Sequence, residues 1–228
     1  MRLQKFLSAA GICSRRKGET YIQTGKITVN GKTVTTLGTK VDPEQDQVLF
    51  QGRPVSLERK KIYIALHKPV GYITSCDHGD QKIVLDLIDV PERIYPIGRL
   101  DKDSTGLLLL TNDGSLHQKL SHPSHDHEKE YDVSVESPIS DADLNQMADG
   151  VHIQGRKTRA ATVRRVSGKR FRIILQEGRN RQIRRMVEKV GNRVTRLKRL
   201  RIASIGLGKL AVGQWRYLTK NEIQHLTK

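Results

Sequence analysis

Residues 96–114, PIGRLDKDSTGLLLLTNDG, form the stretch that decides the fold of this chain. A charged loop with two acids, Asp101 and Asp103, leads into the aliphatic run Gly106–Leu110, which predicts a strand. Residues 112–114 (NDG) then turn the chain into SLHQKLS, a helical pattern. By composition alone the two acids belong to a solvated turn, and they lack the ligand spacing of an EF-hand calcium loop.

The segments around this stretch indicate more strands than helices. The run KIYIALHKPVGYITS begins with alternating strand residues 62–67, and Lys68-Pro69 and Gly71 then break it. Because many strands alternate with few helices beyond residue 60, we expect residues 61–228 to form an α+β domain around a long antiparallel or mixed β-sheet.

Residues 1–60 predict a separate, small α+β unit. Leu3, Phe6 and Leu7 repeat at helical spacing, and Ser14 is a suitable N-cap for a second helix over Arg15–Thr24. The dipeptide Asn30-Gly31 predicts a hairpin, and Val48–Phe50 begins a second strand pair. The polar segment 56–61 is expected to link the two domains.

The charge of the chain points to a polyanionic partner. Its 228 residues carry 41 Lys and Arg against 24 Asp and Glu, a formal net charge of +17. One Trp and three Phe are too few for a membrane-surface helix with a bulky apolar face, so nucleic acid is the favoured partner. No aliphatic run has the length of a membrane span, and no secretory signal is evident, so we expect a cytoplasmic protein.

Cysteine content excludes two further classes. Cys13 and Cys76 are the only cysteines, too few for a disulfide framework or for a zinc site with the usual four-ligand spacing. His122, His125 and His127 form an H-x-x-H-x-H cluster, but no cysteine and no evident carboxylate completes a metal site. We therefore expect a solvated loop there and no metal.

Two basic stretches are candidate RNA contacts. Arg15, Arg16 and Lys17 lie at the start of the second predicted helix, where three cations oppose the helix dipole and favour an anion. Residues 176–201 contain ten Lys and Arg against two Glu, the densest basic stretch of the chain. Such stretches suit a phosphate backbone, although a solvated surface is the alternative for each.

The first domain resembles the S4 domain, a small αL RNA-binding module. The resemblance rests on RLQKFLSAAGICSRRKGETYIQTGKITVNGKTV and covers Arg2 to about Phe50. It implies RNA binding by shape and backbone and does not imply a reaction.

The second domain resembles the RsuA-type pseudouridine synthases. The block PIGRLDKDSTGLL is similar to their catalytic signature G-R-L-D-x-x-[ST]-x-G-L, and HEKEYDVSV (127–135) and LQEGRNRQIRRM (175–186) are similar to two further family blocks. The wording of the blocks is most similar to the RluB/RluF-like branch, which acts on 23S rRNA. The resemblance implies an isomerase that converts uridine to pseudouridine in ribosomal RNA, as a monomer.

This resemblance assigns the catalytic role to Asp101. The reaction breaks an N1–C1′ bond, turns the base and rejoins it through C5, so no metal or redox cofactor is required. A carboxylate is a suitable reagent at an anomeric carbon. Direct attack on C1′ and removal of a 2′ proton both remain open.

The resemblance also assigns Arg184 as the cation that pairs with Asp101. Desolvation in a base-binding pocket favours the neutral acid, and a fixed cation opposes that effect. A helix capped by Asn180 and running to Val190 would place Arg184 beside the apolar stripe of Ile183 and Met186, half buried. An ordinary surface arginine is the alternative.

Tyr131 is the third catalytic candidate. An aromatic ring offsets part of the cost of flipping a base by stacking on it, and Lys129 shares its face of the strand. A core tyrosine is the alternative. We expect Arg99 to hold the flipped phosphate. The remaining RNA-contact candidates come from the dense basic stretch, and they are Arg179, Arg181 and Arg185.

Two classes of function remain open from the sequence. The first is a pseudouridine synthase for 23S rRNA, with 16S rRNA or tRNA as other possible substrates. The second is a non-catalytic RNA-binding or ribosome-assembly protein that reuses the fold. The presence of Asp101, Tyr131 and Arg184 together favours the enzyme.

Overall fold

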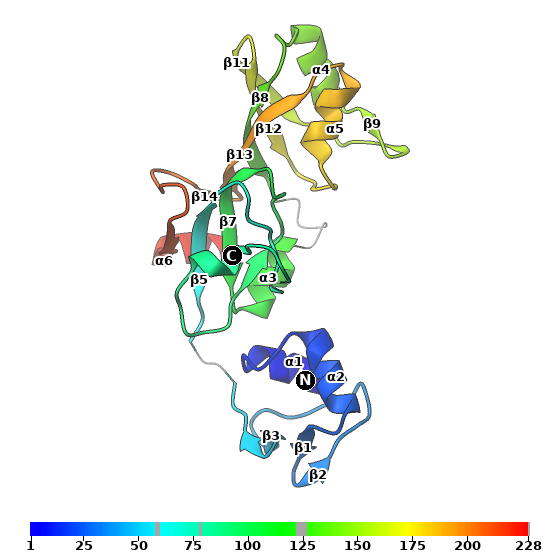
Figure 1. Ribbon diagram of the computed structural model, residues 1–228, viewed down its shortest axis with the longest axis vertical. Coiled ribbons are helices and arrows are strands. Elements are labelled where there is room, and N and C mark those ends of the chain that lie inside the picture. Colours follow the sequence, from blue (N-terminus) through cyan, green and yellow to red (C-terminus); the bar gives the residue numbers. More distant parts are fainter. Residues whose placement is uncertain (58–59, 78, 122–126, 228) are drawn as a thin grey trace. The chain divides into compact units, whose positions relative to one another are not determined.

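The computed structural model (Figure 1) describes residues 1–57, 60–77, 79–121 and 127–227. The chain forms two compact units. The first comprises Met1–Ile62 together with the short segments Val90–Ile94 and Asn112–Gly114, and the second contains the remainder. Within the described ranges, none of the helices combines the length and the apolar character needed to traverse a lipid bilayer.

The first unit contains two helices and four short strands. They are α1 (Leu3–Ala9), α2 (Arg15–Gln23), β1 (Ile27–Val29), β2 (Lys32–Thr33), β3 (Val48–Phe50) and β4 (Arg53–Pro54). The strands pair antiparallel in the order β2-β1-β3-β4. This agrees with the two helices and the strand pairs that the sequence predicts.

Local signals account for these elements. The Ser14 side chain accepts a hydrogen bond from the amide of Lys17 at 3.2 Å, which confirms it as the N-cap of α2. Asn30 and Gly31 have φ values of 50° and 77°, as a type I′ hairpin turn requires. Leu3, Phe6 and other apolar side chains of both helices and the sheet form one small core.

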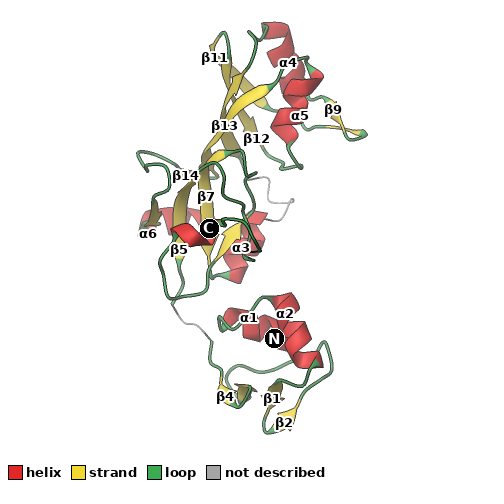
Figure 2. Ribbon diagram, in the orientation of Figure 1, coloured by secondary structure: helices red, strands yellow, loops and turns green. Residues whose placement is uncertain are grey.

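The second unit is built on a large mixed sheet (Figure 2). Its strands are β5 (Tyr63–Lys68), β6 (Tyr95–Ile97), β7 (Thr105–Thr111), β8 (Lys129–Val135), β11 (Thr162–Ser167), β12 (Arg170–Leu175), β13 (Val194–Ile202), β14 (Ile205–Gly206) and β15 (Trp215–Tyr217). A separate hairpin consists of β9 (His152–Ile153) and β10 (Arg156–Lys157). The helices are η1 (Val84–Leu87), α3 (Gly114–Ser121), α4 (Asp141–Asp149), α5 (Gln182–Lys189) and α6 (Lys220–Thr227).

The sheet consists of two antiparallel halves that meet at one parallel pair of strands. The order is β11-β12-β8-β13-β7-β5-β15, with β14 beside β13 and β6 beside β7. Only the junction of β13 with β7 is parallel, and its register joins Lys198 with Thr105 and Arg199 with Gly106. The predicted mixed sheet is confirmed.

The junction requires a glycine on β7. Gly106 has φ +117°, and a Cβ built on it would lie 2.9 Å from the carbonyl carbon of Arg199 and closer still to that residue's nitrogen and oxygen. L-residues with a side chain rarely adopt this conformation, and the strands could not approach each other with a side chain between them. The sequence indicates the aliphatic run that begins at Gly106, but it does not indicate the close approach of Gly106 to the backbone of Arg199.

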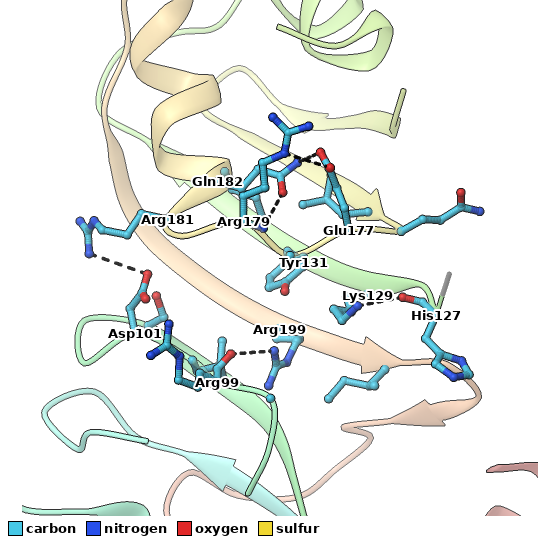
Figure 3. A pocket seen from close by; sticks show the side chains of 18 of the residues that line it. Arg99, Asp101, His127, Lys129, Tyr131, Glu177, Arg179, Arg181, Gln182 and Arg199 are labelled. Atoms are coloured by element: carbon cyan, nitrogen blue, oxygen red, sulfur yellow. Dashed lines mark hydrogen bonds and ion pairs between the residues drawn. The ribbon is translucent and has the colours of Figure 1, made fainter. Parts of the chain in front are cut away.

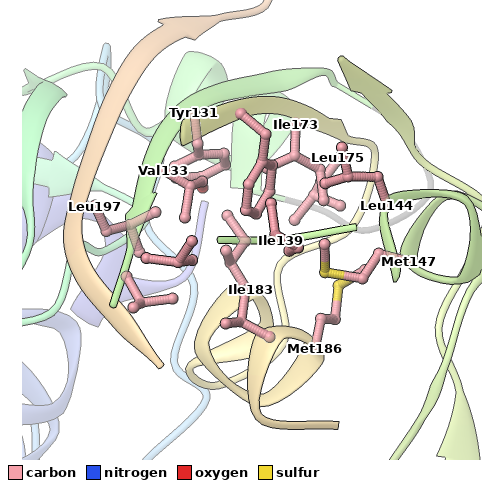
Figure 4. Close-up of a cluster of buried hydrophobic side chains, with 14 of the residues drawn as sticks. Tyr131, Val133, Ile139, Leu144, Met147, Ile173, Leu175, Ile183, Met186 and Leu197 are labelled. Carbon is pink, nitrogen blue, oxygen red and sulfur yellow. The ribbon is translucent and has the colours of Figure 1, made fainter. Parts of the chain in front are cut away.

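Helices α4 and α5 cover one face of the half that contains β8, β12 and β13 (Figures 2 and 4). Their apolar side chains, among them Met147, Ile183 and Met186, pack against Val133 and Phe171 of the strands. Alternation along the strands places every second residue on this buried face. The other half of the sheet has a core of its own around Leu107 and Leu109. Leu108 and Leu110, on the opposite face of β7, are buried as well, which explains the unbroken aliphatic run Leu107–Leu110.

Capping boxes fix two helix starts. The Ser140 hydroxyl accepts from the amide of Asp143 at 3.1 Å at the start of α4, and the Asp143 carboxylate accepts in return. Thr219 and Glu222 form the same motif at the start of α6, as the T-K-N-E spacing predicts.

Candidate active site

A cavity of the second unit lies beside the junction of β7 and β13 and has a volume of about 500 Å³. Its walls come from the β6–β7 loop, from β8, from β13 and from the segment between β12 and α5 (Figure 3). The sequence-predicted residues that line it are Arg99, Asp101, Lys129, Tyr131, Arg179 and Arg181.

Asp101 lies on the β6–β7 loop, and its side chain is 34 % exposed at the cavity wall. The nearest cation is Arg181, whose Nη1 lies 3.7 Å from Asp101 Oδ2. The same guanidinium reaches Asp103 at 3.3 Å. Because these groups are partly exposed and the Asp101 contact is long, the pair stabilises the loop only weakly and leaves the Asp101 carboxylate accessible.

Tyr131 lies across the cavity from Asp101 (Figure 3). Tyr131 lies at the edge of the core of the second unit and is 9 % exposed. Apolar residues of the same strand and of the adjacent strands pack against α4 and α5. The ring is thus both a core residue and a wall of the cavity, so the two interpretations of the sequence do not exclude each other. A ring fixed in this way offers a flat apolar face to a base.

The expected pairing of Arg184 with Asp101 is not found. Arg184 Nη2 lies 3.2 Å from Asp103 Oδ2 and also donates to the Asp103 carbonyl at 3.2 Å and to Ser104 Oγ at 3.3 Å. Its guanidinium is buried behind the loop, 9 % exposed, and it does not line the cavity. The reason is the position of α5, which places Arg184 under the far end of the loop.

The predicted start of this helix was also wrong. α5 begins at Gln182, and Arg181 rather than Asn180 is at its N-cap, with a left-handed φ of 50°. No side chain caps the first turn of α5. The Gln182 side chain instead holds the preceding loop, because it accepts from the amide of Arg179 at 3.0 Å and donates to Glu177 at 2.7 Å. The Asn180 side chain accepts from Arg185 instead.

The other predicted RNA contacts fall into three groups. Arg99 and Lys129 line the cavity, where Lys129 Nζ donates to the carbonyl of His127 at 3.0 Å. Arg179 lines it too, but its guanidinium donates to Glu177 and to the carbonyls of residues 156 and 157, so it holds the loop to the β9–β10 hairpin. Arg185 lies outside the cavity.

Arg15, Arg16 and Lys17 belong to the first unit. All three are exposed in the first turn of α2, where no acidic side chain compensates them. This is the position that the sequence predicts for phosphate contacts.

The histidine cluster is only partly described. His122 and His125 lie outside the described residues, whereas His127 lines the cavity and its Nε2 lies 3.2 Å from the Lys119 carbonyl. Among the described residues, no group of three His, Cys, Asp or Glu side chains is placed to hold a metal ion.

Two buried cations near Asp101 were missed by the sequence analysis. Lys68 on β5 is fully buried, and Arg199 on β13 is 3 % exposed and lines the cavity. Burial lowers the pKa of Lys68 to about 8, although Asp101 and Asp103 partly oppose this shift. The sequence shows Lys68 only as the residue before Pro69 at which a strand run breaks, and nothing in the sequence indicated that either cation is buried.

Comparison with known proteins places this geometry in a family. Residues 62–189 match the model of the RNA pseudouridylate synthase family, and residues 1–48 match the S4 domain. The chain belongs to the RNA pseudouridylate synthase family. Its enzyme class and its S4 domain, both expected from the sequence blocks, are therefore confirmed.

The relatives of this synthase cover essentially its whole length. It is 42 % identical to the dual-specificity RNA pseudouridine synthase RluF of Escherichia coli O6:H1, over 100 % of this chain and 79 % of the relative. It is 41 % identical to the ribosomal large subunit pseudouridine synthase B of Bacillus subtilis, over 99 % and 95 % of the two chains. It is 40 % identical to the ribosomal small subunit pseudouridine synthase A of Yersinia pestis, over 98 % and 97 %.

A solved structure agrees with the fold of the synthase. A crystal structure of a pseudouridylate synthase matches with a TM-score of 0.74 at 29 % identity, and the match covers 99 % of both chains. The expected α+β class, an S4 domain followed by a synthase domain with a mixed sheet, is confirmed.

Proposed function

We propose that this synthase isomerises specific uridines of ribosomal RNA, with 23S rRNA as its substrate, and that Asp101 is the catalytic carboxylate. The proposal is supported above all by one observation: Asp101 and Tyr131, from sequence blocks about 30 residues apart, line the same cavity (Figure 3). A flipped nucleotide in that cavity would meet a carboxylate on one side and an aromatic ring on the other.

Each side chain then has a distinct task. The Asp101 carboxylate acts at the ribose of the target nucleotide, and the Tyr131 ring stacks on the extruded base, which returns about 1–3 kcal/mol of the flipping cost. Arg99, Lys129 and Arg181 surround the cavity with positive charge and hold phosphate groups of the flipped strand. Arg184 supports the reaction from behind the loop, through Asp103.

Residues 1–60 provide a second RNA contact and residues 61–228 the catalytic domain. The three exposed cations at the start of α2, Arg15, Arg16 and Lys17, lie on the S4-like unit and contact the RNA backbone. The enzyme acts as a monomer in the cytoplasm, where ribosomal RNA is made and modified. Light scattering of the purified chain tests the oligomeric state.

The choice of 23S rRNA rests on the residues that occupy the sequence blocks. The overall identities do not decide it, because the large-subunit and small-subunit relatives are 41 % and 40 % identical. The purified enzyme should therefore be incubated with unmodified 23S rRNA, 16S rRNA and tRNA, and pseudouridine mapped by carbodiimide treatment and primer extension. Modification confined to 16S rRNA or tRNA would overturn the substrate assignment.

The catalytic assignment is tested with Asp101→Asn. This variant should lose modification entirely and keep its affinity for RNA, because the amide is isosteric but is neither a nucleophile nor a base. Asp149→Asn, at an exposed position at the end of α4, is the matched control and should modify RNA like the wild type. Retained modification by Asp101→Asn would refute the role of the carboxylate, and absence of modification by the wild type would favour a non-catalytic RNA-binding protein.

A further inference from the structure

The loop that carries Asp101 is held by cations that donate to its backbone. Arg199 Nη1 donates to the carbonyl of Arg99 at 3.2 Å, and its Nε donates to the carbonyl of Leu107 at 2.7 Å. Lys68 Nζ donates to the carbonyl of Ser104 at 2.9 Å. Arg199 therefore connects the start of the loop to β7, and Lys68 fixes the loop just before β7 begins.

These cations come from different elements and are almost completely removed from solvent. Lys68 belongs to β5 and is fully buried, whereas Arg199 belongs to β13 and is 3 % exposed. Figure 3 shows Arg199 beside the Arg99 carbonyl, with Tyr131 nearby. Each cation thus reaches the Asp101 loop from a neighbouring strand of the sheet, on the two sides of β7.

Burying a positive charge to satisfy a carbonyl group costs more free energy than burying a neutral donor. A neutral amide could donate the same hydrogen bonds, whereas burying an ammonium or a guanidinium incurs a desolvation penalty of several kcal/mol per ion. The low pKa of Lys68, about 8, reflects this penalty. The charged groups that act on Lys68 are Asp101, Asp103 and Arg199, so the attraction between Lys68 and the two acids opposes the penalty.

We propose that Lys68 and Arg199 are positioning residues of this synthase, which hold the Asp101 loop through its carbonyl groups and supply the buried positive charge behind the Asp101 carboxylate. This inference rests on the proposed role of Asp101. Two strand residues thus supply the electrostatic support that the sequence predicted for Arg184 alone.

Arg199 also has one donor nitrogen that forms no hydrogen bond with the described residues. Its Nη2 is buried and has no acceptor among the described residues, and the residue lines the cavity. Two nitrogens of the guanidinium are fixed, one on the loop and one on β7, so the third is presented at a defined place. Rotation of the side chain would release the start of the loop from β7.

The test compares single-turnover rates and RNA affinities of full-length variants at saturating 23S rRNA. Lys68→Met and Arg199→Met should lower the rate about 100-fold, the effect of misplacing a reacting group by about 1 Å, with the dissociation constant for RNA changed less than twofold. Arg199→Lys keeps the charge and can reach one carbonyl, so it should recover about tenfold of the loss. The matched control is Arg165→Met, on β11 of the same sheet, whose guanidinium pairs with Asp141 outside the cavity and outside the basic stretch 176–201.

A pH profile separates a charge effect from a merely structural one. In the wild type the rate should fall as the pH rises above about 8, because Lys68 loses its proton there. Lys68→Met should be slow but lack this decline, relative to Arg165→Met measured in parallel. Titration of the RNA itself affects all variants alike and cancels in the comparison.

Several outcomes would overturn the inference. Rates within threefold of the wild type for both Met variants, equal losses of rate and affinity, or an unchanged alkaline decline in Lys68→Met would each contradict it. If the Met variants do not fold, the rate and the RNA affinity of Arg199→Lys still decide: a wild-type rate in that variant would contradict the inference. Activity of Asp101→Asn would instead refute the proposed function, so the two failures are distinguishable.

Discussion

The glycine at the junction of the two half-sheets yields the sharpest structural prediction. Gly106→Ala introduces a Cβ at φ +117°, within 2.9 Å of the carbonyl carbon of Arg199 and closer to its nitrogen and oxygen. The neighbouring atoms are backbone, so no side-chain rotation relieves the overlap. β13 must move away from β7, or the parallel register of Arg199 with Gly106 must break.

The expected magnitude has two parts. Backbone strain of a residue with a side chain at positive φ costs about 1–2 kcal/mol, and overpacking typically costs a further 1–3 kcal/mol. Together they lower the free energy of unfolding of the second unit by about 2–5 kcal/mol. For a unit of this size, each kcal/mol lowers the melting temperature by about 2–4 °C, so we expect a decrease of about 10 °C.

Trp215 provides the assay, because it is the only tryptophan of the chain and lies in the second unit on β15, paired with β5. Its fluorescence during urea and thermal unfolding follows that unit. Gly208→Ala is the control: φ is +57° there and a Cβ would contact nothing within 4 Å, so only the strain term, about 1–2 kcal/mol, applies. If Gly106→Ala is no less stable than Gly208→Ala, the close approach of β7 and β13 is wrong.

Three further predictions concern titration and capping. The Arg216 guanidinium lowers the pKa of Glu222 to about 2; the resulting stability is present above pH 4.5 and is lost as the pH falls towards 2. With this carboxylate 22 % exposed, screening limits its contribution to about 1–2 kcal/mol, and urea unfolding should show the advantage over Glu222→Gln disappearing in that range. The stability contribution of Lys68 changes with pH for a different reason. Its pKa is lowered from 10.5 in the unfolded chain to about 8 in the folded chain, so the unfolded chain binds the proton more tightly. The free energy of unfolding of the wild type should gain about 2–3 kcal/mol relative to Lys68→Met between pH 8 and 10.5, and a constant difference would contradict the burial of the charge. Ser140→Ala removes the capping box of α4 and should cost about 1 kcal/mol in urea unfolding, whereas an unchanged midpoint would show that the cap is dispensable.

The topology of the sheet explains why Asp101 and Tyr131 line one cavity. A parallel pair of strands inside an otherwise antiparallel sheet cannot be joined by a tight turn, so β7 and β13 come from distant parts of the chain. The loop before β7 carries Asp101, and β8 on the other side of β13 carries Tyr131. The junction therefore brings residues from separate sequence blocks to one cavity, on a rigid sheet that fixes their separation.

The sequence by itself determined the elements whose signals are local. Ser14 as a helix cap, the Asn30-Gly31 turn and the Thr219 capping box depend on residues within four positions of one another, and all were predicted. The blocks around Asp101 and Tyr131 identified the family, because order and spacing of motifs persist along the chain. The same information could not locate the start of α5, since no side chain caps it and the N-cap position is held by Arg181 in a left-handed conformation.

Only the tertiary structure decided which charges meet. Arg184 reaches Asp103, 81 residues earlier, and Arg199 reaches the carbonyl of Arg99, 100 residues earlier, at separations where no local pattern restricts the partner. Sequence composition presents these arginines as part of one basic stretch suited to phosphate. Folding places some of them at the cavity wall and buries others behind the loop that carries Asp101. The position of a strand or helix in the fold, and not the residue type, determines whether a cation faces solvent or a carbonyl.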